Sequence, residues 1–232
     1  MKNIHSIFLL TAVLLTVTAC NKDEENNTDT QLIAGLSYFP VDSGIVRFYD
    51  VDSIYWDEFT GLNDTISYEL KEVIAANFID DQGRPAQRIE RFKKDSTGTW
   101  VIHRVWSMVR TNFRAEVLEE NTRFIKTVFP TVTATTWNGN AYNTNGDQTY
   151  EITAVDIPAS SNGLSFNKTL HVLEENDPAN FIYDYQQLEK YADGIGAYYK
   201  FKSYIVFDTQ PPYLDTISGY VYTEKLNDYI LP

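Results

Sequence analysis

The sequence predicts a mainly β protein: a single antiparallel, strongly curved sheet of about ten strands, with at most one or two short helices. Its 232 residues include 16 tyrosines, 13 phenylalanines and 4 tryptophans, and aromatic side chains suit the half-buried surface of a strand. Apolar and polar residues alternate from Gly44 onward, and turn residues interrupt this alternation at short intervals. Because most connections read as local hairpins, we expect a half-barrel or a sandwich.

The first 19 residues are expected to form a lipoprotein signal peptide. Lys2 precedes an apolar run over Ile7–Val17, which is shorter than the roughly 20 residues of a membrane-spanning helix. Val17-Thr18-Ala19-Cys20 resembles the bacterial lipobox, in which the cysteine after the cleavage site receives acyl chains. Cys20 is the only cysteine, which excludes an internal disulfide. The alternative is an ordinary signal peptide with a chance cysteine, or a short N-terminal anchor helix.

The residues around Cys20 indicate where the protein is held. Acyl chains on Cys20 would bind a membrane, because each buried methylene contributes about 0.8 kcal/mol. Lys22-Asp23-Glu24-Glu25 resembles the acidic export signal of surface-exposed lipoproteins of Bacteroidota. We therefore expect an outer-membrane location facing the cell exterior. The other interpretation of these charges is a solvated tether.

Two parts follow the leader. Residues 20–34 are polar and aperiodic and are expected to form a flexible acidic stalk. Residues 35–232 are expected to form a single β domain. The alternation places its strands over 46–56, 66–71, 84–94, 100–108, 115–118, 123–129, 149–157, 164–173, 196–207 and 217–230. Turn residues separate them at 61–64, 80–83, 95–98, 120–121 and 160–163.

One segment, residues 178–193, fits a helix and a strand equally well. Asp177-Pro178 could start a helix, and Tyr185, Leu188 and Ala192 follow helical spacing. Tyr183 and Tyr185 also alternate as in a strand. Both alternatives stay open on the residue pattern alone.

The charge and motif content exclude several classes of function. A formal net charge of −13 argues against nucleic-acid binding, which needs a surplus of lysine and arginine. No Gly-x-Ser-x-Gly elbow and no glycine-rich phosphate loop occur in the sequence.

His103 and His171 lie on different predicted strands and are expected to be ordinary strand residues. Asn143, Asn145, Asp147 and Glu151 depart from the EF-hand order, so a turn is expected there. We predict no catalytic residue, metal ligand or cofactor.

The tryptophans are the candidate ligand face. Trp56, Trp100, Trp106 and Trp137 could form a carbohydrate-stacking platform or an exposed aromatic face for a lipid or protein partner. The alternative is that these large aromatic side chains belong to the core of the sheet.

A modification pattern occurs more often than composition alone predicts. Bacteroidota-type O-glycosylation uses Asp followed by Ser or Thr and then a small or aliphatic residue or Thr. The candidate acceptors are Thr65, Ser96 and Thr216. Ser53 fits the pattern but lies inside a predicted strand. The same dipeptides are also ordinary turn chemistry.

Four short segments together resemble a family of uncharacterised outer-membrane lipoproteins of Bacteroidota. They are Tyr38-Phe39-Pro40 before the strand with Val51-Asp52-Ser53-Ile54-Tyr55, Val128-Phe129-Pro130 before Trp137-Asn138-Gly139-Asn140, residues 189–196, and Gly219-Tyr220. The resemblance covers nearly the whole chain after the leader and favours a strand at 178–193. The family has no established activity, so it implies no catalytic residues. At the level of fold, the strand pattern is similar to the half-barrels of bacterial lipoprotein carriers, although fold does not fix function.

Three functions remain open at this point. The first is a non-enzymatic, membrane-anchored domain that binds a protein, glycan or lipid. The second is a carrier of a lipid or another apolar ligand, which needs a concave apolar cavity. The third is a glycan-acting hydrolase, which needs convergent carboxylates with at least one raised pKa.

Overall fold

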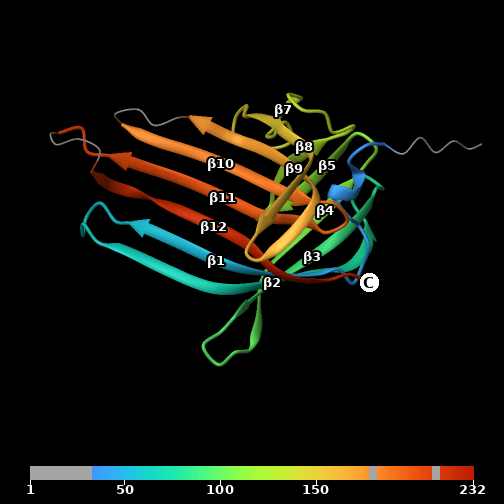
Figure 1. Ribbon diagram of the computed structural model, residues 1–232, viewed down its shortest axis with the longest axis horizontal. Coiled ribbons are helices and arrows are strands. Elements are labelled where there is room, and N and C mark those ends of the chain that lie inside the picture. The colour runs from blue at the N-terminus through green and yellow to red at the C-terminus, as the bar shows by residue number, and fades with distance from the viewer. Residues whose placement is uncertain (1–32, 178–181, 211–214) are drawn as a thin grey trace, which may run out of the picture. The chain divides into compact units, whose positions relative to one another are not determined.

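The computed structural model describes residues 33–177, 182–210 and 215–232, and in this part of the chain a single antiparallel sheet of 12 strands dominates (Figure 1). The strands are β1 Val46–Trp56, β2 Asn63–Ile79, β3 Pro85–Lys94, β4 Trp100–Arg110, β5 Arg114–Glu119, β6 Thr122–Val128, β7 Thr136–Asn138, β8 Thr149–Ser161, β9 Leu164–Asp177, β10 Tyr183–Ala192, β11 Gly196–Phe207 and β12 Thr216–Ile230. A short 3₁₀ helix, η1, spans Leu36–Tyr38. No helix in these ranges is long and apolar enough to cross a membrane.

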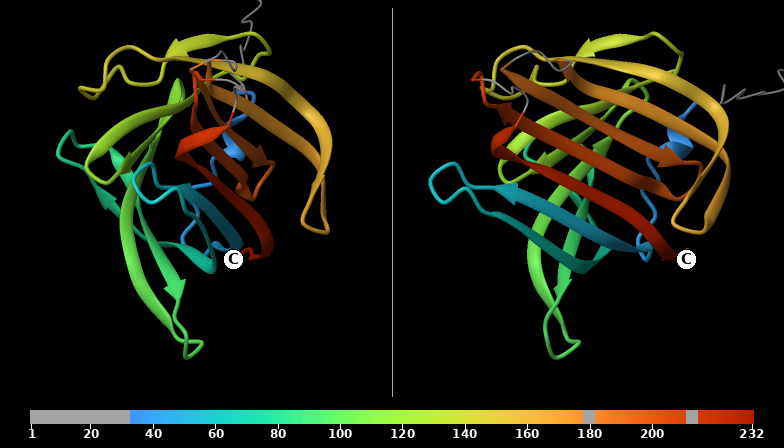
Figure 2. Two further views of the ribbon diagram at one scale, coloured as in Figure 1. Left: turned by 90° about the vertical axis from the view of Figure 1, so that its left-hand side faces the viewer. Right: turned by 60° about the vertical axis from the view of Figure 1, so that its left-hand side comes forward.

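The sheet consists of two meanders joined at the middle. Its order is β6-β5-β4-β3-β2-β1-β12-β11-β10-β9-β8-β7, so the first and last strands are neighbours. They pair from Val46 opposite Ile230 to Trp56 opposite Gly219. The sheet curves strongly (Figure 2), which brings its two outer strands, β6 and β7, back toward each other.

Hydrogen bonds link these two edges. The Ile125 amide on β6 donates to the Gly139 carbonyl at 2.9 Å. The Trp137 indole on β7 donates to the Ile125 carbonyl at 2.8 Å, and the Asn143 side chain donates to the Arg123 carbonyl at 2.9 Å. The sheet is therefore nearly closed.

The core fills the end of the curved sheet where η1 lies. Tyr38 and Phe39 are both buried in it. The Phe39 ring lies 4.4 Å from that of Tyr191 and 6.3 Å from that of Phe129. Arg110 fixes η1 by donating to the carbonyls of Leu36 and Phe39. Phe39, Phe129 and Tyr191 belong to three of the four segments that carry the family resemblance. These three segments therefore meet in the core.

The predicted single, strongly curved antiparallel sheet is confirmed, and of the two forms left open it is not the sandwich. The strand count is corrected, because the sheet has twelve strands where the sequence predicts about ten. The extra strands are β7, which is too short to show an alternating pattern, and β10. Over Tyr183–Ala192 the strand alternative is right, because β10 pairs with both β9 and β11. Cys20 and the proposed helix start at Pro178 lie outside the described residues.

Candidate functional site

Charged side chains lie on the concave face of the sheet, where a purely apolar core is the usual arrangement. The first group, here the arginine cluster, comprises Arg47, Glu72, Arg91 and Glu224, all buried. Arg47 pairs with Glu72 at 2.7 Å, and Arg91 bridges Glu72 at 3.1 Å and Glu224 at 2.5 Å. The register explains the pairing, because Arg47, Glu72 and Arg91 stand opposite one another on β1, β2 and β3.

The second group, here the lysine cluster, comprises Lys126, Lys200, Glu119, Glu174 and Glu189. Lys126 contacts Glu174 and Glu189 at 2.8 Å each and Glu119 at 3.1 Å. Lys200 contacts Glu189 at 2.7 Å and Glu119 at 3.3 Å. These residues come from β5, β6, β9, β10 and β11, so the cluster ties five strands together.

The surroundings of the lysine cluster shift the pKa values of its members in opposite directions. Burial opposes charge on Lys126, yet its three carboxylate neighbours raise its pKa well above the ordinary value. Burial likewise disfavours charge on Glu189, but Lys126 and Lys200 hold the pKa of Glu189 well below the ordinary value. Burial and the charge of Glu189 raise the pKa of Glu174. Paired charges of this kind are stable inside a protein only while every partner is present.

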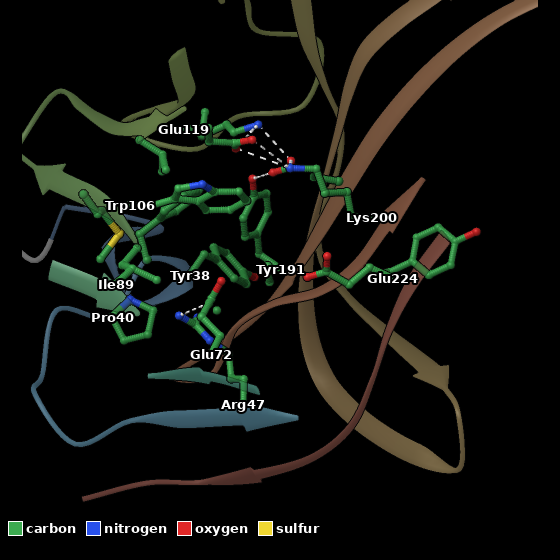
Figure 3. Close-up of a pocket in the computed structure, with 18 of the residues that line it drawn as sticks. Tyr38, Pro40, Arg47, Glu72, Ile89, Trp106, Glu119, Tyr191, Lys200 and Glu224 are labelled. Carbon is green, nitrogen blue, oxygen red and sulfur yellow. Dashed lines mark hydrogen bonds and ion pairs between the residues drawn. The ribbon is translucent and has the colours of Figure 1, made fainter. Parts of the chain in front are cut away.

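A small inner cavity of about 60 Å³ lies between the two clusters (Figure 3). Trp106 separates them, with the Arg91 guanidinium 4.1 Å and the Lys200 ammonium 5.4 Å from its ring. Ligand cavities usually measure about 300–1,000 Å³. The inner cavity is too small for a cofactor-sized molecule or an acyl chain.

Two larger hollows open beyond the lysine cluster. The tyrosine cavity, of about 480 Å³, is lined by Tyr68, Tyr220, Tyr222 and Trp106, with Arg104 at its edge. The amide cavity, of about 400 Å³, is lined by Asn140, Asn145, Gln148 and Gln187, with Asp147, Glu175 and Tyr185. Both volumes fall within the usual range of ligand cavities.

Lys202 on β11 lines both of these cavities. The register places it between Gln187 on β10 and Tyr222 on β12. Among the described residues, no hydrogen bond or ion pair engages its ammonium group. Burial and the nearby charge of Lys200 lower the pKa of Lys202. Lys202 is thus a cation between two hollows that no carboxylate of the described residues contacts directly, although Glu174 and Glu119 act on it from further away.

The polar groups of the amide cavity are held in position by one another. Asn140 donates to Gln148 at 3.2 Å, and Gln148 donates to Glu175 at 3.0 Å. Asp147 accepts a hydrogen bond of 2.6 Å from Asn138, and Gln187 donates to the Tyr185 hydroxyl. The cavity therefore presents ordered donors and acceptors side by side.

A row of tyrosines follows the rim next to Lys202. Tyr185, Tyr204, Tyr220 and Tyr55 stand opposite one another on β10, β11, β12 and β1. The rings of Tyr185 and Tyr204 lie 5.7 Å apart, edge to face. Burial and the neighbouring Tyr220 raise the pKa of Tyr185 to about 12. The row therefore gives this rim flat rings that end in hydroxyl groups.

The structure places the four tryptophans apart. Trp106 is 8% exposed and borders the inner and tyrosine cavities. Trp100, at the β3–β4 hairpin, packs on Phe48 with ring centres 6.0 Å apart. Trp137 packs against Tyr150 at the closing edge, and Trp56 ends β1. Of the three cavities described above, Trp106 alone among the tryptophans lines any.

The candidate glycosylation sites lie outside the tyrosine and amide cavities. Thr65 is exposed on β2, and Ser96 is exposed in the turn between β3 and β4. Thr216 is partly buried at the start of β12. Ser53, by contrast, lines the tyrosine cavity. Thr65 and Ser96 are therefore the two acceptors that a modifying enzyme could reach most easily.

Among the described residues, several groups that a hydrolase would need are already engaged with other side chains. His171 contacts Thr169 and Tyr198 at 3.2 and 3.1 Å, whereas His103 lies at the tyrosine cavity. Glu174, with its raised pKa, and Glu189 converge on the Lys126 ammonium at 2.8 Å each, so both carboxylates are held in buried ion pairs. In the described ranges, no group of three His, Cys, Asp or Glu side chains could hold a metal ion.

The sequence analysis missed Lys202 and both charged clusters. A signal exists, since charged residues recur at alternate positions in a strand, as with Lys200 and Lys202. Which of the two strand faces turns inward depends on the curvature of the whole sheet, and the pattern alone does not give it.

No protein-family model and no curated protein matches the chain. Two crystal structures do, each with 10% sequence identity, a TM-score of 0.41, and coverage of 83% of this chain and 98% of the other. One is a candidate lipoprotein from Parabacteroides distasonis. The other is a candidate exported protein with a YmcC-like fold from Bacteroides fragilis. At this identity and TM-score, neither says what this chain binds.

Proposed function

We propose that this chain is an exported lipoprotein, anchored to the outer membrane by acyl chains on Cys20 and facing the cell exterior, whose β domain binds a small anionic molecule. The leader and lipobox at residues 1–20 support the anchor. The two open cavities beside Lys202 support the binding role. The proposal includes no enzymatic step.

One observation carries the binding proposal: Lys202 stands unpaired beside a network in which the other inner cations are paired. Arg47, Arg91, Lys126 and Lys200 each contact at least one carboxylate. A partly buried ammonium group without a counter-ion is costly. An anion bound at Lys202 would offset that cost, and its charge-assisted hydrogen bond would contribute about 1.5–3 kcal/mol.

The same network disfavours the apolar carrier. An acyl chain drawn into the interior would have to lie against the arginine and lysine clusters, and these ionised groups gain nothing from hydrocarbon. The inner cavity, which lies between the two clusters, is too small for an acyl chain. The lining of the two open cavities is tyrosine, amide and charge.

Titration of the full-length protein in detergent with citrate and glucuronate, followed by calorimetry, tests the proposal. We expect at least one of these carboxylates to bind, and Lys202→Met to weaken it by about tenfold or more through loss of the charge-assisted bond. Lys168→Met, at an exposed site on β9, removes the same charge and should leave binding unchanged. Binding that Lys202→Met does not alter would contradict the proposal.

A further inference from the structure

We propose that the anion bound at Lys202 belongs to an acidic saccharide that spans the tyrosine cavity and the amide cavity. This inference rests on the proposed function, because it assigns a chemical class to the molecule at the same site. Three features of the described residues lead to it: the position of Lys202, the chemistry of the amide cavity and the tyrosines of the other cavity.

The position of Lys202 calls for a ligand that carries an anionic group between two parts, one for each hollow. Lys202 belongs to the lining of both hollows, which lie on either side of it. Their volumes of about 480 and 400 Å³ are each much larger than a carboxylate alone needs. A ligand that fills both hollows must extend in two directions from its anionic group.

The amide cavity calls for groups that donate and accept hydrogen bonds. Amide side chains such as those of Asn145 and Gln187 offer both a carbonyl oxygen and an NH₂ group. The carboxylates of Asp147 and Glu175 also line this cavity and only accept. Sugar hydroxyls satisfy all of these groups, because each hydroxyl both donates and accepts.

The same carboxylates argue against phosphorylated ligands. A phosphate group carries close to two charges and only accepts strong hydrogen bonds. In the amide cavity it would face Asp147, Glu174 and Glu175, and like charges at short range repel. A ligand with a carboxylate near Lys202 and only hydroxyls in the amide cavity avoids this repulsion, and a second carboxylate can lie on the side of the tyrosine cavity, which Arg104 lines.

The tyrosine cavity supplies flat surfaces for a sugar ring. Tyr68, Tyr220 and Tyr222 combine an apolar ring with a polar hydroxyl. Tyr222 is already oriented, because its hydroxyl donates to Glu224 at 2.6 Å. Rings fixed in this way can pack on the C–H face of a pyranose while hydroxyls around them meet its oxygens.

The test uses digalacturonate as the acidic saccharide and two matched probes. The first probe is the disaccharide in which both carboxyl groups are reduced to alcohols, and the second is tricarballylate, which has carboxylates but no hydroxyls. We expect the full-length protein in detergent to bind digalacturonate about tenfold or more tightly than either probe, because each probe lacks one of the two sets of contacts.

Variants separate the two parts of the site. Lys202→Met should weaken digalacturonate binding by about tenfold or more, and Asn145→Ala by a few fold through loss of a neutral hydrogen bond. Asn145 is exposed in a loop, so its replacement should not disturb folding. Asn167→Ala, at an exposed position on β9, is the matched control and should bind as the parent protein does.

The measurements distinguish failure of the saccharide inference from failure of the anion site. If tricarballylate binds as tightly as digalacturonate, in a manner that depends on Lys202 but not on Asn145, the anion site stands and the saccharide is wrong. If the reduced disaccharide binds as well as the acidic one and Lys202→Met has no effect, the anion site is wrong. If no probe binds, both proposals fail.

Discussion

Lys202 and Lys200 are two residues apart on one strand and face the same side of the sheet, yet their chemistry differs. Two carboxylates hold Lys200, and they raise its pKa although burial opposes this. Lys202 has no such pair among the described residues, and burial together with Lys200 lowers its pKa. The proton on Lys202 is therefore the one most easily lost in this group, and a bound anion would stabilise it.

His171 gives a prediction about pH. Burial, with a smaller contribution from Lys190, lowers the pKa of His171 from 6.5 to about 4. The unfolded chain binds a proton below about 6.5 and the folded protein only below about 4, so stability is lost as pH falls between these values. Because the ring is only half-buried, we expect a loss of roughly 1 kcal/mol.

The measurement is urea unfolding at pH 7 and pH 4.5. The parent protein should lose more stability than His171→Gln over this interval. In parallel, NMR titration of the imidazole of His171 should give a midpoint near 4. A midpoint near 6.5, with the same pH dependence in both proteins, would show that the ring is not desolvated as described.

At the scale of the elements, the sequence predicts most strands and turns correctly. The turn at Glu120-Asn121 is an example, since both residues adopt positive φ (46° and 65°) as a tight hairpin requires. β10 was ambiguous because its aromatic residues fit two periods at once, and pairing with β9 and β11 decides the outcome. Tertiary pairing commonly overrides local preference in this way.

The candidate site could not be predicted in the same manner. Lys126 meets Glu174 and Glu189, which are 48 and 63 residues further along the chain. Such contacts follow from the curvature that brings β6 opposite β9 and β10, and no local pattern encodes that curvature. The tryptophans stand out in the sequence because they are few. The chemistry of the concave face, however, is determined by its charged side chains.

Gly219 in β12 gives a prediction about one strand. Its φ of +131° suits glycine, and a Cβ there would lie 2.0 Å from the Tyr204 carbonyl oxygen on β11. Because backbone must move to relieve this contact, Gly219→Ala should lower the free energy of unfolding by about 2 kcal/mol or more. Urea unfolding of the purified protein measures this loss.

Gly98→Ala is the matched control. Gly98 has a φ of +84° in an exposed turn, and a Cβ there would meet nothing within 4 Å. Its replacement should cost about 1 kcal/mol, from backbone strain alone. Equal effects of the two replacements would mean that β11 and β12 do not approach as closely as described.

At the scale of the whole domain, Lys126 joins the two meanders. It lies on β6 at one edge of the sheet and contacts Glu174 and Glu189 in the other half. Lys126→Met leaves buried Glu174 without its counter-ion and Glu189 with Lys200 alone, so we expect a loss of about 3–5 kcal/mol in the free energy of unfolding. Thermal and urea unfolding would both report it.

Two further variants make that result specific. Adding Glu174→Gln to Lys126→Met removes one uncompensated charge and should restore part of the lost stability. Lys168→Met, on the exposed face of β9, should change stability by no more than about 0.5 kcal/mol. No recovery in the double variant would indicate that the loss comes from packing and not from charge.

The pairing of β1 with β12 also sets the order in which the domain can be completed. Each meander is built from neighbouring hairpins that can form as soon as their own residues are available. The joint between them needs residues 216–230, which a ribosome makes after all the other strands. A chain threaded N-terminus first through a secretion pore would stay incomplete until its final segment emerged. Under the proposed export, the complete sheet would then form only after the chain has crossed the membrane.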